Sequence, residues 1–229
     1  MFAGKLLRLL HLCDPALPIG GFSHSYGLET YVQQGVVHDK DTAAQFINQQ
    51  LSQNICFTDA AFVSLAYDAA TTDNFEKIME LDEHCTALKI SREVRQGSNK
   101  LGIRLLKIFN NKDEHALSNK YLQSTKGRKS SGHYSIAFGL LAAEMFIDKT
   151  DTLTGFFYNA AAGFVVNCVK LIPLGQQDGQ SILMSFFPLI DTLVESCSQP
   201  DENRIGICCP AFDIRCMQHE QLYSRLYMS

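Results

Sequence analysis

The sequence predicts an all-α fold, and three observations favour it. The chain has 229 residues but only six prolines, none of them between Pro18 and Pro173. Within that span, apolar residues recur at the spacing of about 3.6 residues that lines one face of a helix. Strand signals are weak, because strict alternation is rare and hairpin dipeptides such as Asn-Gly are nearly absent. We therefore expect one domain over residues 1–229, a single compact bundle of about ten helices.

The first elements are short. An apolar run over residues 1–12 predicts a helix that ends before two prolines. The following Gly-Gly-Phe-Ser sequence predicts a tight loop, with Ser23 as the N-cap of the next helix.

Periodic apolar positions predict eight further helices. Thr58 is expected to cap the second of these, and Asp73 or Asn74 the third. The last three are strongly apolar and are expected to lie at the centre of the bundle. In chain order, the predicted helices cover Asp41–Asn54, Thr58–Ala70, Phe75–Cys85, Ser91–Phe109, His115–Gln123, His133–Phe146, Leu153–Leu171 and Ser181–Ser196.

Charge and composition exclude several classes of protein. The 20 basic and 24 acidic residues give a net charge of −4, so we expect no binding to nucleic acid or to an anionic membrane. The longest apolar stretches fall short of the ~20 residues that span a bilayer. Basic residues interrupt the N-terminal run, which is unlike a signal peptide. We expect a soluble cytoplasmic protein with reduced thiols.

Motifs for catalysis are missing. The sequence has no phosphate-binding Gly-x-x-x-x-Gly-Lys-Ser/Thr loop and no dinucleotide-binding Gly-x-Gly-x-x-Gly after a strand. Gly21–Ser25 is similar to a nucleophile elbow, but Ser25 replaces the second glycine and no strand enters the turn. We therefore predict no catalytic residues and no enzymatic activity.

A cluster of soft ligands lies near the C-terminus. Such ligands suit zinc or nickel, but no Cys-x-x-Cys pair is present and cysteine is also a common core residue. A helical metal-binding protein therefore remains the alternative function. The candidate ligands are Cys208, Cys209, Cys216 and His219.

Basic residues recur along one predicted helix. They favour a solvated helix face, and a surface for a protein partner is the alternative. The residues are Lys89, Arg92, Arg95, Lys100, Arg104 and Lys107.

Three segments resemble the motifs of one known family. Residues 14–29 have the sequence Asp-Pro-Ala-Leu-Pro-Ile-Gly-Gly-Phe-Ser-His-Ser-Tyr-Gly-Leu-Glu. Residues 169–180 have the sequence Val-Lys-Leu-Ile-Pro-Leu-Gly-Gln-Gln-Asp-Gly-Gln, and residues 213–229 contain Tyr-Ser-Arg-Leu. In this order they resemble the signatures of the urease accessory protein F family, and the resemblance extends over residues 6–229.

The resemblance implies an all-helical protein that dimerises and has no chemistry of its own. Members of the family join a second scaffold protein, accessory protein D (also called H), and a GTPase, accessory protein G. This chaperone complex docks on urease apoprotein and, with GTP hydrolysis, installs two nickel ions bridged by a carbamylated lysine. The GTPase supplies the phosphate-binding loop. The resemblance thus implies no tightly bound cofactor, with nickel passing through the complex.

The resemblance also assigns roles to residues of the first two motifs. Phe22 in the Gly-Gly-Phe loop would lie at the GTPase-binding surface. Lys170 and Gln180 would lie on a polar route that passes nickel between partners. Many members carry Arg at the position of Lys170, so the charge is kept but the bidentate fork is lost.

Two further regions would contact protein partners. Tyr158 resembles a dimer-contact position, although Thr154 stands where some members carry Arg. Residues 210–229 would form a tail that binds the scaffold protein, with Tyr223 and Arg225 as anchors of the kind common at interfaces. We expect this tail to be disordered in the isolated chain and to fold on binding.

Overall fold

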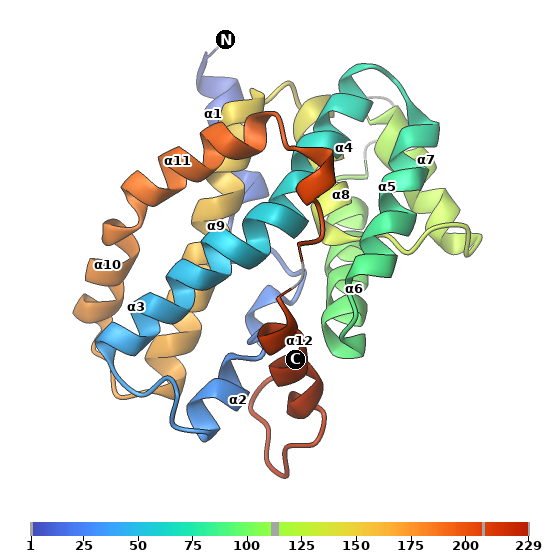
Figure 1. The fold of residues 1–229 in the computed structure, drawn as a ribbon. Helices are drawn as coiled ribbons and strands as arrows, with labels where there is room; N and C mark the ends of the chain where they lie inside the picture. The colour runs from blue at the N-terminus through green and yellow to red at the C-terminus, as the bar shows by residue number, and fades with distance from the viewer. Residues whose placement is uncertain (1, 111–114, 208, 229) are drawn as a thin grey trace.

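The computed structural model describes residues 2–110, 115–207 and 209–228, and no residue of these ranges lies in a strand (Figure 1). The prediction of an all-α fold of about ten helices is confirmed. Single 3-10 turns occur at Gly21–Ser23 and Glu202–Arg204. The α-helices are α1 Phe2–Leu12, α2 Leu28–Gln33, α3 Lys40–Gln49, α4 Ala61–Thr71, α5 Phe75–Leu88, α6 Arg92–Ile108, α7 Ala116–Lys126, α8 Tyr134–Glu144, α9 Lys149–Leu171, α10 Gln176–Ser185, α11 Phe187–Ser198 and α12 Pro210–His219.

Helix α8 lies at the centre, as its composition predicts. Every residue from Ser135 to Ala142 is buried, so the helix contacts protein all round. It packs most extensively against α4 and then against α6. The α4–α8 pair approaches closely at Gly139, where a Cβ atom would overlap the backbone carbonyl of Val63. A side chain at this position is therefore excluded by the packing.

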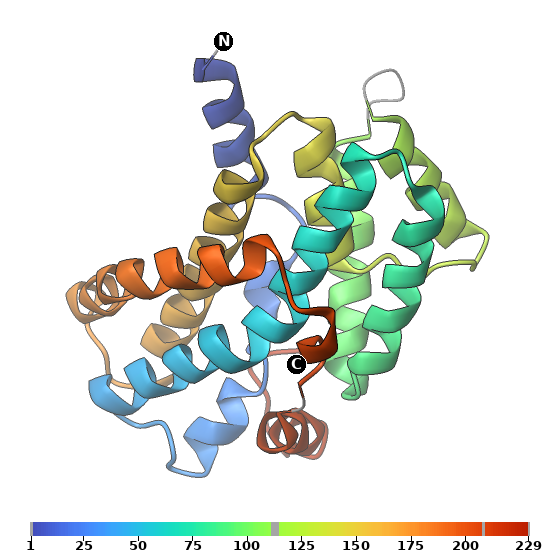
Figure 2. The same ribbon diagram turned by 45° about the horizontal axis from the view of Figure 1, so that its top comes forward.

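A continuous helical rod crosses the molecule from Lys40 to Thr71 (Figures 1 and 2). A π-helical stretch, Gln50–Ala60, joins α3 directly to α4. The predicted break with an N-cap at Thr58 is wrong, because the Thr58 hydroxyl donates instead to the carbonyl of Asn54 one turn earlier, at 2.6 Å.

Two other predicted boundaries are corrected. Ser23 does not cap a helix: its hydroxyl donates to the carbonyl of Gly20 at 2.7 Å, and α2 begins only at Leu28. The predicted helix Ser181–Ser196 is two helices, α10 and α11. Pro188, in the first turn of α11, has no N–H to donate and so cannot continue the hydrogen bonding of α10.

Helix α9 is the longest in the described part of the chain. By length and composition alone, with a mean hydropathy of 1.2, α9 could cross a membrane. Helices α10 and α11, which meet at a bend of 42°, would also be long and apolar enough if they were counted as one span. Half of the apolar stretch of α9 is buried within the protein, where it packs against α11 and α10. These contacts are those of a core helix.

A buried polar network joins α5, α7 and α8. The Asp82 carboxylate accepts hydrogen bonds from the Tyr121 hydroxyl and from the backbone N–H groups of residues 131–133. Burial lowers the pKa of His133 to about 4, so this side chain is neutral near pH 7. The network thus satisfies its buried polar groups and fixes the start of α8.

The α4–α8 approach predicts that Gly139→Ala destabilises the protein. The added methyl group must push two central helices apart, which should cost about 1–3 kcal/mol of unfolding free energy. Gly163→Ala is the matched control, because Gly163 lies on the solvent side of α9 with open space around it. Alanine lowers the conformational entropy of the unfolded chain relative to glycine, which should make that variant more stable by about 0.5–1 kcal/mol. Urea unfolding measures both; equal effects would contradict the packing described here.

Candidate partner-binding site

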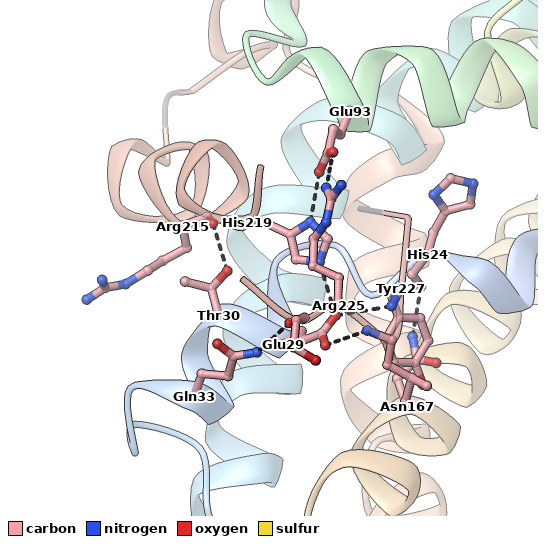
Figure 3. Close-up of polar contacts among 12 residues, drawn as sticks. His24, Glu29, Thr30, Gln33, Glu93, Asn167, Arg215, His219, Arg225 and Tyr227 are labelled. Atoms are coloured by element: carbon pink, nitrogen blue, oxygen red, sulfur yellow. Dashed lines mark hydrogen bonds and ion pairs between the residues drawn. The ribbon is translucent and has the colours of Figure 1, made fainter. Parts of the chain in front are cut away.

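The last residues of the chain fold back onto its first helices. Helix α12 lies against α2 and α6, and the C-terminal segment, residues 220–228, follows it along the same surface (Figures 1 and 3). This arrangement brings residues from both ends of the sequence together beside α6.

The carboxylate of Glu29 is the centre of these contacts (Figure 3). Glu29 lies in the first turn of α2 and is only 5% exposed. Its Oε1 accepts the backbone N–H of Leu226 at 2.7 Å, and its Oε2 accepts that of Tyr227 at 3.1 Å. The Nε2 of His219 lies 3.1 Å from Oε2. One buried carboxylate therefore satisfies two backbone amides and a ring nitrogen.

His219 links this carboxylate to a second one. Its ring is fully buried, with Nδ1 2.8 Å from Oε2 of Glu93 on α6. Since an ionised carboxylate only accepts, the protonated ring, with two N–H donors, is the form that fits both contacts. Arg225 donates to Oε1 of Glu93 at 2.7 Å. His219 thus bridges the two carboxylates, and Arg225 pairs with one of them; we call Glu29, Glu93, His219 and Arg225 the anchor network.

Backbone contacts extend the attachment along the segment. Thr30 donates its hydroxyl to the carbonyl of Arg215 at 3.1 Å, and Gln33 donates to that of Ser224 at 3.2 Å. Tyr227 is buried against the body of the protein. Our expectation of a disordered tail therefore differs from the structure, in which buried partners within the same chain hold α12 and the segment after it.

Hydrogen bonds from two helices also fix the backbone of the Gly-Gly-Phe loop. Gly20 has a φ of 87°, a left-handed conformation that favours glycine. Arg104 of α6 donates to the carbonyl of Ile19 at 2.8 Å, and Asn167 of α9 donates to that of His24 at 2.9 Å. Phe22, between these fixed points, is 72% exposed. The loop therefore presents an aromatic ring to solvent from a fixed backbone.

The loop and the C-terminal segment lie side by side. The backbone N–H of Met228 donates to the carbonyl of Ser23 at 2.8 Å. Predicted residues from two separate motifs thus share one surface, which exposes apolar, aromatic and cationic side chains. We call it the loop–tail face; it comprises Phe22, Tyr223, Arg225, Leu226 and Met228.

Lys170 and Gln180 are also brought together. Lys170 lies in the last turn of α9 and Gln180 in α10, and both line a small hollow with Val166 and Gly179. Both residues are exposed. Asn167, one turn before Lys170, contacts the Gly-Gly-Phe loop, so this end of α9 adjoins the loop.

Tyr158 lies elsewhere, in the middle of α9. It is 46% exposed, and the centroid of its ring lies 6.4 Å from the ring centroid of Phe187 on α11. Thr154, one turn earlier, is exposed and donates its hydroxyl within its own helix, to Thr150. The position expected to contact a second copy therefore belongs to a separate, partly apolar surface.

The candidate metal ligands do not converge in the described residues. His219 faces two carboxylates, and Cys216 packs with Val94 and Phe212. Cys209 contacts the same apolar cluster, and Cys208 lies outside the described residues. In the described ranges, no three or more His, Cys, Asp or Glu side chains are arranged so that they could hold a metal ion. The hypothesis of a metal site built from these residues gains no support from their geometry.

Sequence reasoning missed the two carboxylates of the anchor network. Glu29 entered the sequence analysis only as the last residue of the first family motif, and Glu93 was not among the candidate residues. The available signal was Glu29 in the first turn of a short helix, directly after the Gly-rich motif. Its partners lie as many as 198 residues further along the chain, so local pattern does not reveal them.

Comparison with known proteins places these features in a family. The UreF family model matches residues 37–187, about two thirds of the chain. The chain belongs to the UreF family. It is 47% identical to a protein of Actinobacillus pleuropneumoniae serotype 5b over 226 residues, which are 99% of this chain and 100% of the relative.

Two further relatives support the same family at different distances. A protein of Haemophilus influenzae strain PittGG is 50% identical over 221 residues, 96% of this chain and 94% of the relative. A protein of Bacillus sp. strain TB-90 is 33% identical over 225 residues, 98% of this chain and 99% of the relative. All three are named urease accessory protein UreF. These near-complete alignments reach beyond the stretch that the UreF model covers.

The anchor network predicts that Glu29→Gln releases the C-terminal segment. The amide keeps one accepting oxygen but loses the charge that faces His219 and two N–H groups, which should cost about 2–4 kcal/mol. Trypsin should then cut the bond between Arg225 and Leu226 faster than in the unmodified protein. Glu83→Gln, at an exposed position of α5, is the matched control. Equal cleavage rates in both variants would show that Glu29 does not hold the segment.

Proposed function

We propose that this protein is a urease maturation factor that acts as a non-catalytic scaffold. The observation that carries the proposal is the loop–tail face in a chain whose UreF relatives are named urease accessory proteins. Aromatic, methionine and arginine side chains are enriched at protein interfaces, and here they stand on a backbone that buried polar contacts fix. A fixed support lowers the entropy that a partner must overcome on binding.

The proposed partners are those that the family resemblance implies. They are a second scaffold protein (accessory protein D or H), a GTPase (accessory protein G) and urease apoprotein. Phe22 would contact the GTPase, and Tyr223 and Arg225 would contact the second scaffold. The hydrogen bond between Met228 and Ser23 supports a compact arrangement in which these two partners bind next to each other.

Nickel enters this proposal as cargo, and the protein itself holds no tightly bound cofactor. Lys170 and Gln180 would lie on the polar route between partners. Their shared, solvent-accessible hollow at the α9–α10 junction supports such a role, because both side chains can reach a docked protein. GTP hydrolysis by the partner would drive insertion of the metal into urease.

The proposal extends to assembly and cellular location. A second copy of the chain would pack on the surface around Tyr158 and Phe187, where large apolar side chains are exposed. The free cysteines of the described residues and the acidic overall charge fit a protein that works in the cytoplasm, without nucleic acid or membrane as a partner.

Urease activation in cells that co-express the urease structural and accessory proteins tests this function. With Phe22→Ala, urease activity and nickel content per enzyme should fall about tenfold or more, because losing a central aromatic anchor typically costs 2 kcal/mol or more. Phe146→Ala is the matched control, since Phe146 is also 72% exposed but lies beyond the end of α8, away from the loop–tail face.

A second matched pair tests the α9–α10 junction. Lys170→Ala should lower activation without unfolding the protein, whereas Lys126→Ala, in the last turn of α7, should leave activation unchanged. Circular dichroism reports that each variant is folded. Full nickel content and activity of urease in the absence of this protein would refute the proposed function.

A further inference from the structure

Two cysteines far apart in the sequence face each other at the junction of the rod and α11. Cys56 lies in the π-helical stretch between α3 and α4, and Cys197 lies in the last turn of α11. Their Sγ atoms are 3.4 Å apart, although the residues are separated by 141 positions. Such π-helical stretches are rare and often occur at functional positions.

The two thiols have different environments. One thiol donates to the other. The Cys197 thiol also donates to the backbone carbonyl of Cys56, with Sγ and the oxygen 3.5 Å apart. The pKa of Cys56 is lowered by the hydrogen bond from Cys197 and, less strongly, by the charge of Arg204, although burial acts in the opposite direction. The same pair contact, with burial, raises the pKa of Cys197. Cys56 is therefore suited to be the thiolate of the pair.

Other buried cysteines lack these features. Burial raises the pKa of Cys85 to about 12, and does the same for Cys168. Cys85 lies beside the Ser135 hydroxyl, with Sγ and Oγ 3.8 Å apart, and the side chains of Cys85 and Cys168 are fully buried. Both behave as small apolar core residues. They serve as internal references for the pair.

An exposed segment lies beside the pair. Both cysteines are less than 5% exposed, but residues 199–207 are largely solvent-exposed, and the charge of Arg204 in this segment acts on Cys56. Gly206 donates to the carbonyl of Phe57 at 2.8 Å, and the Arg204 guanidinium lies over the Phe57 ring at 4.4 Å. A local opening of this short segment, without global unfolding, would admit a small reagent.

We propose that Cys56 and Cys197 form a reversible dithiol–disulfide site that reacts with low-molecular-weight disulfides such as oxidised glutathione. The Cys56 thiolate attacks one sulfur of the reagent, forms a mixed disulfide and expels one glutathione thiolate. The Cys197 thiol gives its proton to solvent, attacks the Cys56 sulfur and expels the second thiolate. The protein dithiol loses two electrons, and the reagent is reduced to two thiols.

The geometry requires only a small movement. A disulfide bond of about 2.05 Å needs the sulfur atoms to approach by about 1.4 Å. Cys197 lies at a helix end, where backbone adjustment is least costly. The bond would fix the end of α11 to the rod, and with it the start of the segment that leads to α12. Disulfides are rare in reducing compartments, and those that form there are usually transient.

Peptide mapping of the oxidised, folded protein tests the proposal. The purified full chain is incubated with oxidised glutathione, the remaining thiols are alkylated, and the non-reduced digest is analysed by mass spectrometry. We expect one disulfide, between Cys56 and Cys197, formed before glutathione appears on Cys85 or Cys168, and reversed by dithiothreitol. A thiol titration should show two of the eight thiols lost.

Single variants separate the roles of the two cysteines. Cys197→Ser should accumulate a glutathione adduct on Cys56, because the second step is blocked. Cys85→Ser, the matched control, should form the disulfide as the unmodified protein does. Eight free thiols after incubation of the folded chain, or a disulfide between other cysteines, would overturn the proposal.

Discussion

The buried carboxylate of Glu29 is the group on which the C-terminal arrangement depends. It accepts two backbone amides of the C-terminal segment and faces His219, which in turn faces Glu93. Removing one member of such a buried set leaves an uncompensated charge, so the loss of any member destabilises the contacts of the others. The segment then lies against the Gly-Gly-Phe loop through Met228 and Ser23, which gives the UreF chain its loop–tail face.

The loop–tail face rests on a rigid interior. The central α4–α8 contact, with Gly139 at its closest point, fixes the rod and α6, and α6 supplies both Glu93 and Arg104. The loop is thus tied to α6 on one side and to α9 through Asn167 on the other. A partner that drew the C-terminal segment away would have to replace the hydrogen bonds of Glu29, which sets a physical cost on releasing it.

Sequence patterns predicted the helices well and the long-range contacts poorly. Proline-free apolar periodicity located α4 to α9, because it reports which face of a helix is buried. The predicted N-caps at Thr58 and Ser23 were wrong. Each hydroxyl is of a type that can cap a helix, but here it donates to a backbone carbonyl three or four residues earlier. The tail was expected to be disordered because it is a terminal segment rich in residues typical of interfaces. Local pattern did not reveal its partner Glu29, which lies 197 residues before Leu226. The Cys56–Cys197 contact was likewise invisible to local pattern.

The most direct test of this account is amide hydrogen exchange at Leu226 and Tyr227 in the free chain near neutral pH. The account predicts that both amides are strongly protected in the absence of any partner, because Glu29 accepts their hydrogen bonds in a buried site. The protection should disappear in Glu29→Gln while that of the α8 core remains. Exchange of both amides in the unmodified protein at the rate of an unstructured peptide would contradict it.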